Sequence, residues 1–134
     1  MNGDSKEPSA PVVLIIDDDP GLRSAMRLML EDEGFKVLTA EDGDEGLSVL
    51  LVADNPVDLV VTDIQMPGKA GNETIHDIRK MRPGIGIIAM SGGGRVGNFD
   101  FLDIARKQGV DAVLQKPFDM NEFVGLARRL ASAR

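Results

Sequence analysis

Five short apolar runs, separated by longer segments with helical periodicity, constrain the fold of this chain most strongly. The runs are rich in β-branched residues, as buried strands are, and they read VVLII, KVLTA, DLVVT, GIIAM and AVLQ. The segments with helical periodicity cover residues 21–33, 44–53, 74–81, 99–107 and 120–130. Such alternation favours a five-stranded parallel sheet with helices on both faces, which is a doubly wound α/β fold.

The length and composition fit one domain. A chain of 134 residues can bury most of its unfolded surface without disulfides or structural metals. Residues 1–10 are polar, contain proline, glycine and serine, and show no periodicity. We therefore expect a flexible leader over residues 1–10 and a single domain over residues 11–134.

Several classes of function are disfavoured by composition. Cysteine is absent and the amino terminus lacks the basic-then-apolar pattern of a signal peptide, so a cytoplasmic protein is expected. No apolar run approaches the ~20 residues that a membrane helix needs. The net charge of −7 repels nucleic acid phosphates, and the few arginines near the carboxyl terminus form no basic patch. Neither membrane insertion nor direct nucleic acid binding is expected.

Polar residues stand at the carboxyl ends of four of the predicted strands. Asp17 and Asp18 follow the first run, Asp63 the third, Ser91 the fourth and Lys116 the fifth. In open α/β sheets these ends line the crevice that binds ligands. A strand order of 2-1-3-4-5 places Asp63 at the centre of the crevice. The acidic pair would lie a strand spacing of roughly 5 Å away, and Ser91 and Lys116 would lie on the other side.

This set of side chains suits a divalent cation and a phosphoryl group. Three carboxylates this close repel one another unless a cation neutralises them, and oxygen ligands without histidine or cysteine match Mg²⁺. The Lys116 ammonium, the Ser91 hydroxyl and the Gly92 amide could stabilise phosphoryl oxygens. The pocket therefore points to a carboxylate that is itself phosphorylated.

Four segments carry a resemblance to a known family. LIIDDDP, LVVTDIQMPG, IIAMSGG and LQKPF, in this order and spacing, resemble the signature segments of the response-regulator receiver domain of two-component signalling. The resemblance spans about residues 12 to 132. It implies a flavodoxin-like receiver fold with strand order 2-1-3-4-5.

The resemblance also implies roles for individual residues around a Mg²⁺ ion. Asp63 would be the phosphoacceptor, and Asp17 and Asp18 would form the acidic pair, with Asp18 the more direct metal ligand. Gln65 would offer its backbone carbonyl to the metal.

The remaining implied roles concern the phosphoryl group and the signal. Ser91 stands at the position of the family's switch serine or threonine, and Lys116 at that of its lysine, followed by a proline that often has a cis bond. Most members carry tyrosine or phenylalanine three residues before that lysine. Val113 occupies this position here, so a switch by an aromatic ring is not expected.

The resemblance implies partners as well. The phosphoryl donor would be a phosphohistidine on a sensor histidine kinase or a histidine phosphotransfer protein. A downstream protein would bind the surface formed by the fourth helix, fifth strand and fifth helix. The chain would be a signalling module that modifies itself, and not an enzyme that turns over an external substrate.

Three alternatives stay open at this point. An aspartate-dependent phosphohydrolase also forms a phosphoaspartate, but that class resembles a motif with a second acidic residue where this chain has Gln65. A flavodoxin-like cofactor binder would have a hydroxyl-rich first loop and aromatic residues around the cofactor. In this chain the first loop is acidic, and tryptophan and tyrosine are absent. Because the chain ends directly after its fifth helix, it is expected to be either a stand-alone receiver or a piece of a larger hybrid kinase or regulator.

Overall fold

The computed structural model describes residues 10–52, 56–64, 71–92, 95–96, 99–100, 103 and 106–132, and the following account concerns these residues. The expected leader lies outside them except for Ala10, and so does Gln65.

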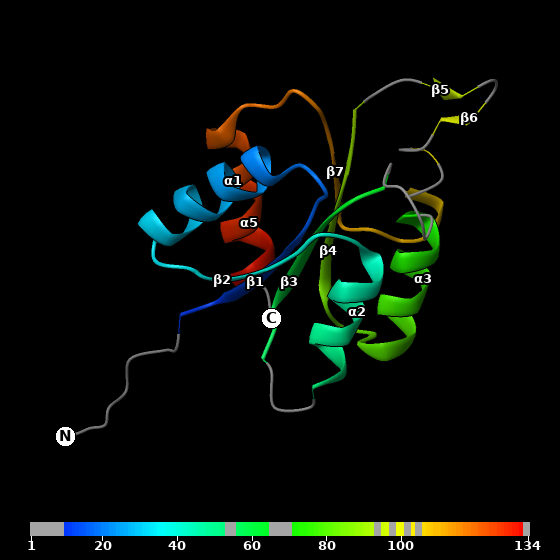
Figure 1. Ribbon diagram of the computed structural model, residues 1–134, viewed down its shortest axis with the longest axis horizontal. Helices are drawn as coiled ribbons and strands as arrows, with labels where there is room; N and C mark the ends of the chain where they lie inside the picture. The colour runs from blue at the N-terminus through cyan, green and yellow to red at the C-terminus, as the bar shows by residue number, and fades with distance from the viewer. Residues whose placement is uncertain are drawn as a thin grey trace.

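A five-stranded parallel sheet forms the centre of the molecule. Its strands are β1 (Val12–Ile16), β2 (Lys36–Ala40), β3 (Leu59–Asp63), β4 (Gly86–Ser91) and β7 (Ala112–Gln115). They lie side by side in the order β2-β1-β3-β4-β7, and each neighbouring pair is parallel (Figure 1). Because β7 is the fifth strand of this sheet along the chain, the predicted order 2-1-3-4-5 is confirmed.

Helices cover both faces of the sheet, as the alternating sequence pattern predicts. Helices α1 (Pro20–Asp32) and α5 (Met120–Ser132) lie on one face, and α2 (Gly43–Leu51) and α3 (Gly71–Met81) lie on the other (Figure 1). Successive side chains of a strand point to opposite faces, so the sheet carries two apolar cores. Val13 and Ile15 belong to the core under α1 and α5, whereas Leu14 and Ile16 belong to the other. Within the described residues, no helix has the length and apolar character needed to cross a membrane.

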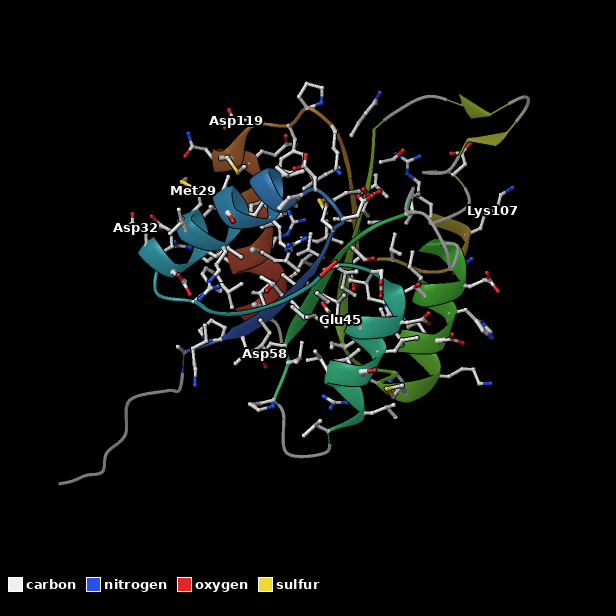
Figure 2. The ribbon with its side chains drawn as sticks, in the orientation of Figure 1. Met29, Asp32, Glu45, Asp58, Lys107 and Asp119 are labelled. Carbon is white, nitrogen blue, oxygen red and sulfur yellow. The ribbon has the colours of Figure 1, made fainter. Side chains whose placement is uncertain are left out.

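Short polar residues and a glycine set the boundaries of helices α1 and α5. Asp19 caps α1, because its carboxylate accepts hydrogen bonds from the amides of Gly21 and Leu22 at 2.9 and 3.2 Å. Gly34, with a φ of 95°, lets the chain leave that helix in a left-handed turn. Asp119, labelled in Figure 2, caps α5 through the amide of Asn121 at 2.7 Å.

The predicted helix over residues 99–107 is wrong at its start. Phe99–Asp100 forms a short strand, β6, which pairs in antiparallel register with β5 (Arg95–Val96). Helical backbone is present at Asp103, Arg106 and Lys107. The sequence does contain the signal that was missed, since a Gly-Asn pair between β-branched and aromatic residues is typical of a hairpin turn.

Candidate functional site

Two neighbouring strands place the acidic residues at one end of the sheet. Ile16 pairs with Thr62 in the β1–β3 register, so the next residues along the two strands, Asp17 and Asp63, lie side by side. Carboxylate oxygens of Asp17, Asp18 and Asp63 all lie within 4.8 Å of one another. Asp17 and Asp63 are buried, whereas Asp18 is exposed. The three predicted carboxylates therefore lie together at the carboxyl ends of β1 and β3.

Lys116 supplies a cation to this cluster. Its ammonium Nζ donates hydrogen bonds to Asp17 Oδ2 and to Asp63 Oδ2, each at 2.8 Å. The backbone amide of Lys116 donates to the Ser91 carbonyl at 2.7 Å, which fixes the start of the side chain at the end of β4. Sequence reasoning placed Lys116 beyond Ser91, away from Asp17. The long side chain in fact crosses the site and joins both strands that carry the buried carboxylates.

The environment of Lys116 favours its charged form. Burial acts to lower the pKa of its ammonium, but the hydrogen bonds to Asp17 and Asp63 and the negative charges of both groups outweigh burial. The pKa of Lys116 is therefore raised above its ordinary value of 10.5. The site thus holds a permanent positive charge between two buried carboxylates at neutral pH.

Ser91 and Gly92 lie at the same end of the sheet. Ser91 is fully buried as the last residue of β4, and the neighbouring β3 strand ends beside it with Asp63 paired to Met90. Gly92 is exposed and lines a cleft of about 400 Å³. The Lys116–Pro117 peptide bond that borders this cleft is cis, as the sequence resemblance implies.

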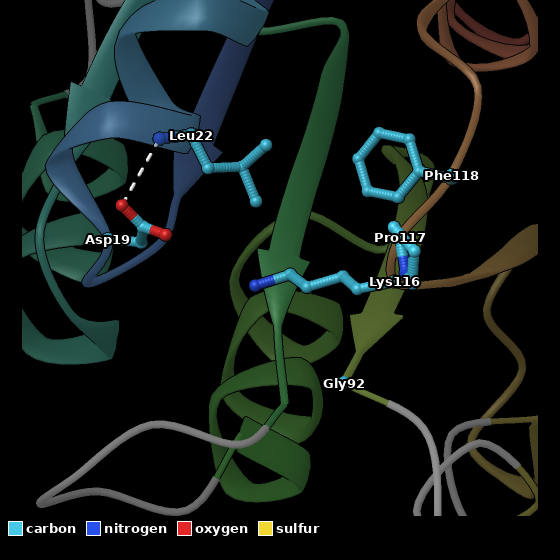
Figure 3. Close-up of a pocket in the computed structure, with 6 residues that line it drawn as sticks. All are labelled: Asp19, Leu22, Gly92, Lys116, Pro117 and Phe118. Carbon is cyan, nitrogen blue, oxygen red and sulfur yellow. Dashed lines mark hydrogen bonds between the residues drawn. The ribbon is translucent and has the colours of Figure 1, made fainter.

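The cleft opens between the start of α1 and the loop that follows β7. Figure 3 shows the Lys116 side chain extending from the β7 side of the cleft toward the α1 side. The lining residues are Asp19, Leu22, Gly92, Lys116, Pro117 and Phe118. A ligand in this cleft would meet Lys116, whose ammonium also contacts the carboxylates of Asp17 and Asp63.

Not every predicted site residue can be placed, and one contact was not predicted. Asp17, Asp18, Asp63 and Lys116 are brought together, with Ser91 and Gly92 at the same edge, while Gln65 lies outside the described residues. The roles of these residues stay predictions. Sequence reasoning missed Arg23, whose guanidinium contacts the main chain of the acidic pair. A helical arginine carries no sequence signal for such a contact.

Mg²⁺ fits the donor set that the structure presents. Three carboxylates contribute hard oxygen ligands from within 4.8 Å, two of them fixed on strand ends and one exposed to solvent. An exposed ligand leaves room for the water molecules that Mg²⁺ usually retains. The described residues that would hold the ion are Asp17, Asp18 and Asp63.

Comparison with known proteins gives one consistent family. The sequence pattern of the response regulator receiver domain matches residues 13–128. The transcriptional regulatory protein GlrR of Escherichia coli is 39% identical over 107 residues, which are 80% of this chain and 23% of GlrR. The transcriptional regulatory protein CpxR of Klebsiella pneumoniae is 34% identical over 118 residues, which are 88% of this chain and 48% of CpxR. The chain thus spans less than half the length of these relatives.

Solved structures agree with the sequence comparison. A CheY-like receiver domain protein from Methanospirillum hungatei superposes with a TM-score of 0.83 at 26% identity, covering 93% of this chain and 96% of that one. The response regulator TrrA from Thermotoga maritima, solved in complex with Mg²⁺ and BeF, superposes with a TM-score of 0.76 at 29% identity. That match covers 90% of this chain and 98% of TrrA.

Proposed function

Because this chain belongs to the response regulator receiver domain family, we propose that it accepts a phosphoryl group on Asp63 in a Mg²⁺-dependent reaction. The donor is a phosphohistidine on a sensor histidine kinase or a histidine phosphotransfer protein. The contact that carries this proposal is the Lys116 ammonium, which lies 2.8 Å from carboxylate oxygens of both Asp63 and Asp17.

In the proposed transfer, a carboxylate oxygen of Asp63 forms a bond to phosphorus. The phosphorus–nitrogen bond of the donor breaks, and its electron pair returns to the imidazole. A carboxylate is a weak nucleophile, so the protein contributes mainly by alignment and by neutralising charge. Asp63 ends β3, which is hydrogen-bonded on both sides, and this support fixes the direction of its side chain.

Asp17, Asp18 and Asp63 would hold the Mg²⁺ ion, which when bound neutralises charge on the phosphoryl oxygens. Lys116 already contacts Asp63, so its ammonium can turn to a phosphoryl oxygen attached to that residue with little movement. Ser91 and Gly92, which follow Met90 beside Asp63, offer a hydroxyl and an amide to a further oxygen. These three protein groups, the ammonium, the hydroxyl and the amide, come from the ends of β4 and β7.

The proposed output is a change in protein contacts. We expect a downstream protein to recognise the surface of the fourth helix, predicted from the sequence over residues 99–107, together with β7 and α5. Strand β7 pairs with β4, which ends at Ser91, and leads directly into Lys116. The net charge of −7 disfavours direct contact between this domain and nucleic acid. GlrR and CpxR are named transcriptional regulators, and this chain matches only part of each.

A comparison of labelling with turnover tests this function against the phosphohydrolase alternative. The chain is incubated with a phosphorylated histidine phosphotransfer protein, with Mg²⁺ or with EDTA, and the bound phosphate is counted. We expect at most one phosphate per chain, and only with Mg²⁺. Repeated turnover of para-nitrophenyl phosphate without stoichiometric labelling would instead favour a phosphohydrolase.

A further inference from the structure

Arg23 reaches back from the beginning of α1 to the end of β1. Its Nη1 donates a hydrogen bond of 2.7 Å to the main-chain carbonyl oxygen of Asp17. The Asp17 amide still belongs to the sheet, because it donates to the carbonyl of Ala40 in β2 at 3.1 Å. The paired residues of β1 end at Ile16, so the Asp17 carbonyl lies past the strand ladder and Arg23 takes the place of a strand partner.

This contact holds one of the two peptide groups that flank Asp18. A peptide group is planar, so fixing the Asp17 carbonyl also fixes the direction of the Asp18 amide and the position of its Cα. The peptide group on the other side is held as well, since the Asp19 amide donates to Asp17 Oδ1 at 2.8 Å. The backbone of Asp18 is thus restrained on both sides, once by Arg23 and once by the Asp17 carboxylate.

The Asp18 carboxylate depends on this backbone support more than its two neighbours do. Asp17 and Asp63 are buried and each accepts a hydrogen bond from Lys116. Asp18 is exposed, and within the described part of the chain no hydrogen bond or ion pair reaches its side chain. Its carboxylate nevertheless lies within 4.8 Å of the other two.

We infer that Arg23 is a positioning residue of the Mg²⁺ site, holding the Asp17–Asp18 peptide so that Asp18 presents its carboxylate to the ion. This inference rests on the proposed function. The charge of Arg23 acts in the opposite direction, because a guanidinium near the acidic cluster repels a cation. Removal of Arg23 therefore gives opposite results for the two effects: Mg²⁺ binds more weakly if Arg23 positions Asp18, and more tightly if only its charge matters.

The test compares Mg²⁺ affinity of the full chain with that of two variants by isothermal titration calorimetry. Arg23→Met keeps much of the apolar stem and removes the donor, and we expect about tenfold weaker Mg²⁺ binding, which is typical when a group that orients a metal ligand is lost. Arg27→Met is the matched control. Arg27 lies one turn further along α1, where it pairs with Glu31 at 3.1 Å, and its side chain is 52% exposed. Its loss should leave Mg²⁺ affinity unchanged.

Two further readouts separate positioning from a general structural role. At saturating Mg²⁺, Arg23→Met should be labelled by acetyl phosphate at nearly the wild-type rate, because only metal affinity has changed. In an Asp18→Asn background, Arg23→Met should cause no further loss of Mg²⁺ affinity. Should Arg23→Met fail to fold, as judged by thermal melting without Mg²⁺, Arg23→Gln, which also removes the charge, is measured in its place with the same expected direction.

The outcomes are distinguishable from failure of the proposed function. Unchanged or tighter Mg²⁺ binding in Arg23→Met, or a further loss in the Asp18→Asn background, would overturn the role of Arg23 while labelling of the wild type stands. A labelling defect that persists at saturating Mg²⁺ would also overturn it. If the wild-type chain itself binds no Mg²⁺ and takes up no phosphate, both the proposed function and this inference are wrong.

Discussion

At the scale of single residues, Lys116 supplies the positive charge that faces the buried carboxylates of the site. Its ammonium lies 2.8 Å from both Asp17 and Asp63, and its raised pKa keeps it charged. A bound Mg²⁺ ion would neutralise the same carboxylates. Lys116 therefore stabilises the buried carboxylates, would compete electrostatically with a bound metal ion, and in the proposed function would contact the phosphoryl group on Asp63.

Replacing Lys116 should separate these effects. In Lys116→Met the buried Asp17 and Asp63 lose their shared partner, so the free energy of unfolding should fall by roughly 2 kcal/mol, between the values for exposed and buried pairs. Mg²⁺ should bind at least about tenfold more tightly, since one nearby positive charge is gone. Labelling by acetyl phosphate should nevertheless slow.

Urea unfolding, titration calorimetry and labelling rates check these three effects on one variant. Weaker Mg²⁺ binding in Lys116→Met would contradict the electrostatic account, because it would mean that Lys116 supports the metal site and does not compete with it.

The residues of the site differ in how far the sequence could predict them. Asp17, Asp18 and Asp63 were predictable, because parallel strands bring their carboxyl ends to one edge. The reach of Lys116 across to Asp17 and the contact of Arg23 with the Asp17 carbonyl were not. Long side chains have many rotamers, and strand periodicity fixes only where such side chains begin.

At the scale of elements, close approach at a glycine sets the place of α2. An ideal Cβ added to Gly46 would lie 2.4 Å from Cδ1 of Ile16, a fully buried residue of β1. Helix α2 therefore packs against the strand that ends in the acidic pair so closely that a side chain at position 46 would displace the buried side chain of Ile16. Apart from the predicted helix over residues 99–107, the predicted helix and strand boundaries agree with the structure to within a few residues. The β5–β6 hairpin was not predicted, because strands of two residues are too short to show an alternating pattern. The Gly-Asn pair was the only sequence signal for it.

Two glycine substitutions should change stability in opposite directions. Gly46→Ala should destabilise the protein by about 1–2 kcal/mol, because overpacking against Ile16 outweighs the gain in helix propensity. Gly125→Ala in α5 should stabilise it by about 0.5–1 kcal/mol, because a Cβ there meets no atom within 4 Å and alanine favours the helix. Urea unfolding of both variants checks the pair. A Gly46→Ala protein as stable as the wild type would contradict the close packing of α2 on β1.

At the scale of the whole molecule, a sheet buried on both faces holds a polar cluster at one end. The two apolar cores were predictable from the alternation of strand and helix patterns, and the strand order from the resemblance to receiver domains. The solved receiver structures share this fold. The pattern of strands and helices does not reveal which kinase or downstream protein binds this chain, because binding depends on surface complementarity to that other protein. The central claim for the molecule is that its architecture serves one reactive carboxylate, that of Asp63.

The mass of the intact chain after treatment with acetyl phosphate and Mg²⁺ tests this claim most directly. The wild-type chain should gain ~80 Da, the mass of one phosphoryl group. Asp32→Asn, an exposed change at the end of α1 away from the acidic cluster, should gain the same mass. Asp63→Asn should gain none. An adduct of full yield on Asp63→Asn would contradict the account, because it would place the phosphoryl group on another residue.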